Sequence, residues 1–212
     1  MLNFDIDMIF RIPALLLALT VHEYAHAVVA DSMGDPTPRF MGRLTMNPLK
    51  HLDPVGTIML LFAGFGWAKP VEVNPNYFRN GRKSMMAVSF AGPGSNFLLA
   101  FMALFLSAVF SVMGYAKSGI YTFLFWVQLY NIWFALFNLM PIPPLDGSKI
   151  LLSILPGRYA YEYIKIEQYS FILLIVLVFS GFTGMVLRPL AQFILNSMGF
   201  VIGAIFSIFG LF

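Results

Sequence analysis

The first long apolar stretch of the chain reads MIFRIPALLLALTVHEYAHAVVADSM and covers residues 8–33. It exceeds the roughly 20 residues that a helix needs to cross a bilayer, so it predicts a transmembrane helix. The stretch nevertheless contains His22, Glu23 and His26. Because ionisable groups are costly inside a membrane, such residues usually mark a functional site. This one stretch therefore predicts both the class of the fold and the place of its chemistry.

The composition of the whole chain indicates a membrane protein. Hydrophobic residues make up 59% of the 212 positions and charged residues 11%, whereas soluble domains carry about a quarter charged residues. One soluble core cannot bury so much apolar surface, so lipid is the expected solvent. The lack of cysteine excludes disulfides and thiolate metal ligands. The formal charge of +3 is better explained by membrane topology and lipid head groups than by nucleic acid, which we do not expect as a partner.

Long apolar segments predict an all-α polytopic membrane protein with about five transmembrane helices. The segments are residues 8–33, 85–113, 119–140, 166–187 and 189–211. A shorter, glycine-containing run at residues 55–65 is typical of a re-entrant segment that enters the membrane without crossing it. Residues 39–75 around this run have a non-helical character. We expect short β-strands there, between the first and second spans.

The basic residues predict how these segments are oriented. Ten of the thirteen Lys and Arg residues fall in two loops, residues 34–84 and 141–165, and basic loops usually remain in the cytoplasm. We therefore expect a multi-pass protein of the cell membrane with its N-terminus outside. A single domain is expected over residues 1–212, with a core at about 8–155 and C-terminal helices at about 166–211.

The spacing of the two histidines in the first stretch predicts a zinc site. His22 and His26 are four residues apart, so a helix places both imidazoles on one face. Such a pair can bind one zinc ion, while Glu23 can reach a water molecule beside the metal. Glu23 can take the proton of that water and pass it to the leaving amine of a cleaved peptide. The alternative is a buried cluster without metal, which the membrane setting disfavours.

A catalytic zinc site needs a third protein ligand. Asp146 is the strongest candidate because it follows prolines that interrupt a long apolar helix, an arrangement typical of a ligand at membrane depth. From its position alone, an equally weighted alternative is that Asp146 caps the helix beginning near Gly147. His51 is the remaining histidine of the chain. It is either an additional ligand or gate of the site or, more commonly, a loop residue bonded to the backbone.

Several motifs together resemble the site-2 protease family of intramembrane zinc metalloproteases. They are HEYAH at residues 22–26, NLMPIPPLDG at residues 138–147 and AGPGSN at residues 91–96. The run at residues 42–56 is similar to the short prokaryotic branch of the family, which has no PDZ-like or nucleotide-sensing domain. The resemblance covers about residues 10–155.

This resemblance implies one zinc ion (Zn2+) per chain, held by His22, His26 and Asp146, with Glu23 as the catalytic base. It also implies regulated intramembrane proteolysis, in which a transmembrane protein or peptide substrate, surrounded by membrane lipid, is cleaved toward the cytoplasmic side.

Asn96 and Asn138 match family positions that contact the substrate or the transition state. An amide donor near the zinc could stabilise the developing oxyanion. For Asn96, an equally weighted alternative is helix packing beside two glycines of the same segment.

A different class of function uses the same ionisable residues. A zinc or proton-coupled membrane transporter would employ them as a pathway, but transporters usually contain internal repeats and polar groups on several spans. Neither feature is evident in this sequence. No pattern in the sequence predicts an oligomeric state.

Overall fold

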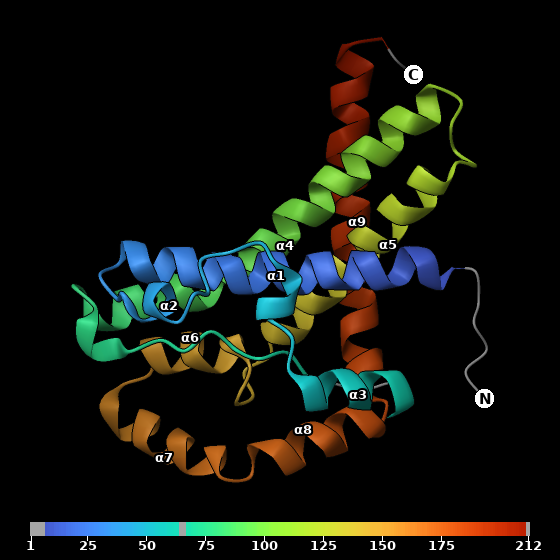
Figure 1. The fold of residues 1–212 in the computed structure, drawn as a ribbon. Helices are drawn as coiled ribbons and strands as arrows, with labels where there is room; N and C mark the ends of the chain where they lie inside the picture. Colours follow the sequence, from blue (N-terminus) through green and yellow to red (C-terminus); the bar gives the residue numbers. More distant parts are fainter. Residues whose placement is uncertain (1–6, 64–66, 211–212) are drawn as a thin grey trace. The chain divides into compact units, whose positions relative to one another are not determined.

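The computed structural model describes residues 7–63 and 67–210, in which all regular structure is helical. The helices are α1 (Met8–Ser32), α2 (Thr37–Phe40), α3 (Pro54–Ala63), α4 (Gly81–Val112), α5 (Gly119–Asn138), α6 (Asp146–Ile154), α7 (Gly157–Glu167), α8 (Ser170–Phe179) and α9 (Phe182–Ile208) (Figure 1). Short 3-10 turns lie at Pro48–Lys50 and Pro75–Tyr77. The predicted all-α class is therefore confirmed for the described residues.

Four of these helices, α1, α4, α5 and α9, are long and apolar enough to cross a membrane. The prediction of about five spans is not confirmed, and the structure differs from it in the C-terminal part. The predicted span at 166–187 is interrupted at Gly181, whose φ of +75° turns the chain between α8 and α9. Glycine adopts this left-handed conformation without the steric cost that a side chain would add. Helix α9 instead continues through Pro189, since transmembrane helices tolerate proline.

The short strands expected within residues 39–75 are not found in the described part of that region. One isolated antiparallel bridge joins Leu52 and Ala68. Residues 68–74 are extended, but their hydrogen bonds go largely to side chains from other segments rather than to a neighbouring strand. The predicted re-entrant run at 55–65 is largely helix α3, and its last two residues lie outside the described residues.

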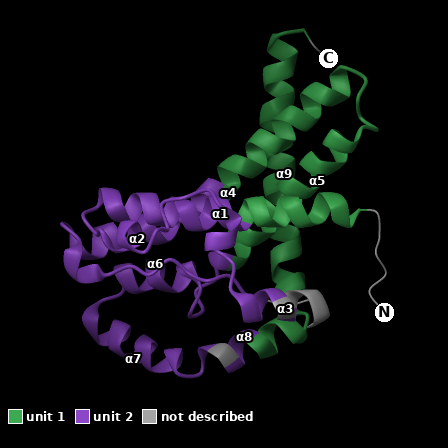
Figure 2. Ribbon diagram, in the orientation of Figure 1, with its two compact units in different colours: residues 1–18, 96–137, 175–212 green, residues 19–95, 138–174 purple. Residues whose placement is uncertain are grey.

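The chain divides into two compact units (Figure 2). Unit 1 contains residues 1–18, 96–137 and 175–212, and unit 2 contains residues 19–95 and 138–174. In unit 1, small and aliphatic side chains of α1, α4 and α5 form the core: Ala14, Ala103, Leu124 and Val127. In unit 2, a smaller core is formed by Ala30, Phe78 and Val88. The residues of the predicted metal site all belong to unit 2.

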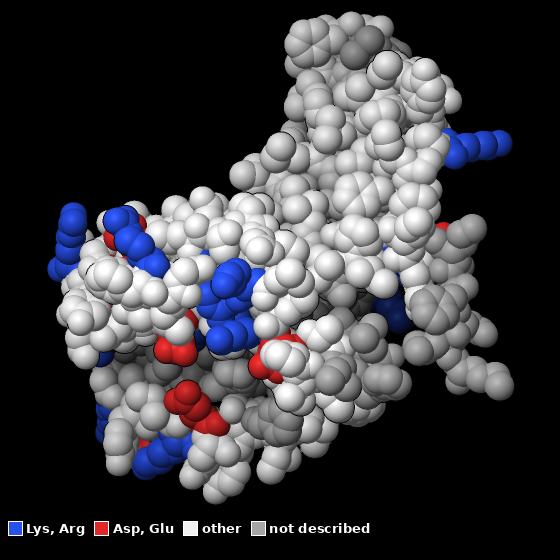
Figure 3. Space-filling view, viewed as in Figure 1, with Lys and Arg blue, Asp and Glu red and all other residues white. Residues whose placement is uncertain are grey.

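Charged side chains are unevenly distributed over the surface. On the face drawn in Figure 3, most Lys, Arg, Asp and Glu side chains lie over unit 2, and few lie over unit 1. Helix α9 in unit 1 exposes large apolar side chains, including Phe200 at 80%, Met185 at 75% and Phe193 at 70%. Apolar side chains exposed to this extent on a long helix are suited to contact with lipid.

Candidate metal centre

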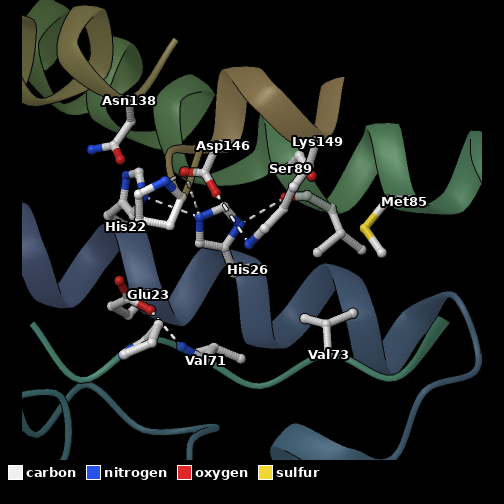
Figure 4. A pocket seen from close by; sticks show the side chains of 13 residues that line it. His22, Glu23, His26, Val71, Val73, Met85, Ser89, Asn138, Asp146 and Lys149 are labelled. Atoms are coloured by element: carbon white, nitrogen blue, oxygen red, sulfur yellow. Dashed lines mark hydrogen bonds and ion pairs between the residues drawn. The ribbon is translucent and has the colours of Figure 1, made fainter. Parts of the chain in front are cut away.

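Three side chains with metal-binding atoms converge in unit 2. Nε2 of His22 lies 3.0 Å and Nε2 of His26 lies 3.1 Å from the same oxygen, Oδ2 of Asp146. The two Nε2 atoms are 3.0 Å apart, and all three side chains are buried. Figure 4 shows them pointing toward one another. The structure thus brings the carboxylate of α6 to two imidazoles on one face of α1.

A hydrogen bond on the far side of the His26 ring determines which nitrogen is free to bind a metal. Nδ1 lies 2.7 Å from the carbonyl oxygen of Val88 on α4. A carbonyl only accepts, so Nδ1 carries the proton, and in neutral imidazole Nε2 then keeps its lone pair. That lone pair and the Asp146 carboxylate repel each other unless a proton or metal cation lies between them. The donor set therefore fits zinc, which binds imidazole nitrogen and carboxylate oxygen, and the bond to Val88 orients the ring.

Asp146 is the first residue of α6, and the preceding Leu145 occupies the N-cap without a side-chain capping bond. The Asp146 carboxylate faces the two histidines through Oδ2, while Oδ1 lies 3.9 Å from Nζ of Lys149. Burial alone would raise the pKa of Asp146, but a proton or cation held between its carboxylate and the imidazoles of His22 and His26 keeps that pKa well below its usual range. The geometry therefore favours a ligand over a helix cap, and the carboxylate stays ionised.

The turn between α5 and α6 places Asp146. Residues 141–144 contain three prolines, and so dense a run removes several backbone donors and ends the helix. Gly147 then packs directly against the end of the turn, since a Cβ at its position would lie 2.2 Å from the carbonyl oxygen of Leu139. Only glycine permits so close an approach of two backbones. The glycine of the Asp-Gly pair thus sets the path that carries Asp146 to the histidines.

Glu23 lies beside these ligands and lines the same cavity, which has a volume of about 180 Å³. Its Oε2 accepts a hydrogen bond of 2.9 Å from the backbone N–H of Val71. Pro70, Val71 and Val73 of the extended segment line the cavity as well. A carboxylate, a cluster able to bind a cation and an extended stretch of backbone therefore face one cavity (Figure 4). This arrangement can activate water and accommodate a peptide.

Comparison with known proteins identifies the family. Residues 10–115 and 112–181 match the sequence profile of the family described as Peptidase family M50. The chain belongs to peptidase family M50. It is accordingly a membrane zinc metalloendopeptidase, and its resemblance to the site-2 proteases is confirmed.

Individual relatives of this M50 chain carry metalloprotease names. "Putative zinc metalloprotease YwhC" of Bacillus subtilis (strain 168) is 40% identical over 206 residues, which cover 94% of each chain. "Putative zinc metalloprotease Rip2" of Mycolicibacterium smegmatis (strain ATCC 700084 / mc(2)155) is 32% identical over 169 residues, 76% of this chain and 63% of that protein. "Zinc metalloprotease MJ0392" of Methanocaldococcus jannaschii is 24% identical over 147 residues, 69% of this chain and 34% of that protein. No solved structure gives a significant match.

The other predicted site residues of this M50 peptidase lie in different surroundings. Asn138 lines the cavity of the metal centre. Asn96 does not line it; its amide nitrogen donates to the carbonyl of Ala18 at 3.0 Å and to Oδ1 of Asn131 at 2.6 Å within unit 1. His51 is fully buried, is absent from the cavity lining and bonds through Nε2 to the carbonyl of Thr45 at 2.9 Å. The structure therefore joins Asn138 to the cluster, whereas Asn96 and His51 are bonded elsewhere.

Three residues of the M50 site were not predicted from the sequence as site residues. Gly92 of α4 faces both histidines, since a Cβ there would lie 2.4 Å from Nε2 of His26 and 2.7 Å from Nε2 of His22. Ser89 lines the cavity, and its buried hydroxyl has no hydrogen-bond partner among the described residues. Lys149 lines the cavity beside Asp146. The available signal was the AGPGSN motif, which includes Gly92 and begins two residues after Ser89.

Proposed function

We propose that His22, His26 and Asp146 hold one zinc ion per chain and that Glu23 is the base of the peptidase reaction. The convergence of three ligand atoms at 3.0–3.1 Å from one another carries this proposal. A tetrahedral zinc site separates its ligand atoms by about 3.3 Å, as follows from metal–ligand distances near 2.0–2.1 Å. Small adjustments of the side chains would therefore accommodate the ion.

When bound, zinc supplies a Lewis acid that polarises the peptide carbonyl and lowers the pKa of water. The side chains of the protein handle the protons and the developing charge. Glu23 accepts the proton of the attacking water on its carboxylate and delivers it to the leaving amide nitrogen. Asn138 lines the same cavity, and its amide can donate a hydrogen bond to the oxyanion.

The substrates in this proposal are membrane proteins, cleaved within or near their transmembrane segments in regulated intramembrane proteolysis. Three observations support this substrate class. The site is built on α1, a candidate membrane span. Its cavity is partly lined by apolar side chains. The extended wall at residues 70–73 suits a substrate that pairs with it as an added strand, because a peptide must be extended to be cleaved.

We further propose that the protein resides in the cell membrane with the metal centre toward the cytoplasm. The two segments that supply the site, residues 19–95 and 138–174, contain ten of the thirteen Lys and Arg residues. Basic loops near membrane spans remain on the cytoplasmic side. The site therefore lies on the side where these residues concentrate.

The variant Glu23→Gln tests the proposed base. It removes the carboxylate but none of the three ligands, so purified protein should retain about one zinc ion per chain and lose cleavage of a model transmembrane peptide. Zinc content is measured by elemental analysis and cleavage by mass spectrometry. Glu72→Gln is the matched control, because Glu72 is an exposed glutamate of the extended segment and is absent from the cavity lining.

The results separate the possible functions. Cleavage that persists in Glu23→Gln would contradict the assigned base. Zinc content that is unchanged in Asp146→Ala would remove Asp146 from the ligand set. Wild-type protein that carries zinc across liposome membranes but cleaves no peptide would favour the transporter.

A further inference from the structure

The extended segment at residues 68–74 is held in place by buried charged side chains. Arg43 has only 2% of its surface exposed, and its guanidinium donates to the carbonyls of Lys50, Lys69 and Pro70. At the other end of the segment, the N–H of Asn74 donates to Oδ2 of the buried Asp35 at 2.7 Å. These side chains provide hydrogen bonds that a neighbouring strand would otherwise supply.

Burying the charged guanidinium of Arg43 costs free energy. Among the described residues, no carboxylate lies within ion-pair distance of its guanidinium. A buried cation without an opposite charge is strongly disfavoured unless its donors are satisfied. Here one nitrogen, Nη2, donates to two successive carbonyls, at 3.0 Å for Lys69 and 2.8 Å for Pro70. Nη1 donates to the carbonyl of Lys50 as well, and a lysine, with its single nitrogen, cannot reproduce this contact of two coplanar nitrogens with three carbonyls.

The carbonyl of Pro70 and the N–H of Val71 belong to the same peptide group. A trans peptide is planar, with its carbonyl and N–H directed to opposite sides. Arg43 binds the oxygen of this group at 2.8 Å, and Oε2 of Glu23 binds its N–H at 2.9 Å. A hydrogen bond to the carbonyl also polarises the group and strengthens its N–H as a donor. Arg43 is therefore connected to Glu23 through one rigid peptide plane.

We propose that Arg43 is a positioning residue for the peptidase reaction, acting on Glu23 through the Pro70–Val71 peptide. The inference rests on the proposed role of Glu23 as the base. Arg43 sets the tilt of the peptide plane, and the Val71 N–H in turn holds one carboxylate oxygen of Glu23. A base displaced by about 1 Å can lose on the order of 100-fold in rate.

The test compares Arg43→Lys and Arg43→Ala with wild type in detergent, measuring zinc content, melting temperature, kcat and KM on a transmembrane peptide. We expect kcat to fall by about tenfold for Arg43→Lys and about 100-fold for Arg43→Ala. Zinc content should be unchanged, and KM should change by less than about threefold, because ligands and substrate contacts are intact. Methylguanidinium should partly restore the kcat of Arg43→Ala, whereas methylammonium at the same concentration should not.

Arg39→Ala is the matched control. Arg39 lies four residues earlier, in α2, and pairs with Asp31 at the surface, with Nη2 2.6 Å from Oδ2. It makes no hydrogen bond to residues 69–71, so its variant should keep the wild-type kcat. Unchanged kcat in both Arg43 variants would overturn the positioning role. So would parallel loss of zinc and melting temperature in Arg43→Lys, which would make Arg43 a purely structural residue. Activity that survives in Glu23→Gln would instead overturn the proposed base itself.

Discussion

At the scale of single residues, the proposed metal centre depends on a glycine as much as on the proposed ligands. Gly92 allows α4 to approach the two imidazoles, because a Cβ there would lie 2.4 Å from Nε2 of His26. The imidazoles are held from several sides, so they have little room to move away. We predict that Gly92→Ala weakens zinc binding by at least about tenfold, a loss comparable to that from changes beside metal ligands. Competition with a chromophoric chelator measures this affinity.

Gly94→Ala is the control for that substitution. Its Cβ would lie 3.3 Å from the ring of Phe90, a side chain that can shift. Gly94 is on the same helix only two residues away, so a general loss of helix packing would affect both variants. Equal zinc affinity in Gly92→Ala and wild type would contradict the prediction, because it would show that the imidazoles can shift to accommodate the added Cβ.

The residues of the site differ in how far the sequence predicts them. His22, Glu23 and His26 are predictable because the helical repeat determines their relative positions locally. For Asp146, position alone does not separate a ligand from a helix cap, since the histidines that approach its carboxylate belong to a distant segment. The motif at residues 91–96 includes Gly92, but its approach to the histidines could not be predicted, because the importance of a missing side chain depends on what lies opposite. Residue type and spacing thus predict local chemistry better than they predict how closely two helices approach each other.

At the scale of elements, the start of α6 is sensitive to its backbone contact. A Cβ at Gly147 would lie 2.2 Å from the carbonyl oxygen of Leu139 and 2.5 Å from that of Met140. Backbone atoms cannot rotate away as a side chain can. We predict that Gly147→Ala displaces α6, reduces bound zinc well below one ion per chain and lowers the melting temperature. Both quantities are measured on detergent-purified protein.

Gly157→Ala, at the start of α7, provides the comparison. A Cβ there meets nothing within 4 Å, so this variant should keep its zinc and its melting temperature. Full zinc occupancy in Gly147→Ala would contradict this prediction. It would mean that the turn after α5 can adopt another backbone conformation that still brings Asp146 to the histidines.

Helix α7 is connected to the proline-containing turn by Tyr163, whose hydroxyl donates to the carbonyl of Pro141 at 2.8 Å. Burial, with a smaller contribution from Glu167, raises the pKa of Tyr163. A raised pKa means that the stabilisation is fully present below the ordinary tyrosine value of about 10 and is lost as pH rises through the higher folded value. We predict that Tyr163→Phe lowers the melting temperature by a few degrees at pH 8.

That difference in melting temperature between Tyr163→Phe and wild type should disappear only at a pH above about 10. Tyr161→Phe is the control on the same helix, since 63% of Tyr161 is exposed and its ring remains in the variant. A difference that is already absent at pH 8 would show that the hydroxyl does not stabilise α7.

The C-terminal elements show where hydropathy misleads. Residues 166–187 and 189–211 have the length and apolarity of two spans, and Pro189 is a plausible boundary from sequence alone. The break instead lies at Gly181, where positive φ separates α8 from α9. Glycine and proline are both compatible with a turn or with a continuous transmembrane helix. Sequence alone therefore does not separate these outcomes.

At the scale of the whole molecule, the number of spans determines the side on which the C-terminus lies. Four crossings by α1, α4, α5 and α9 place both ends of the chain on one side, whereas five would separate them. The ten basic residues at 34–84 and 141–165 favour cytoplasmic loops on the opposite side. We therefore predict that reporters fused to the N-terminus and to the C-terminus both report the outside.

Lysine labelling in cells tests the same topology without fusions. Lys117 lies in the turn between α4 and α5, while Lys50 and Lys165 lie in the two basic loops, and all three are exposed. A membrane-impermeant amine reagent should modify Lys117 in intact cells, and the other two only after permeabilisation. Single Lys→Arg variants assign each modified site by mass spectrometry and preserve the charge that sets orientation. Labelling of Lys50 in intact cells would reverse the orientation, because the loops that carry the metal centre would then face outward. A C-terminal reporter in the cytoplasm, with Lys117 still labelled from outside, would instead show an additional crossing after α5.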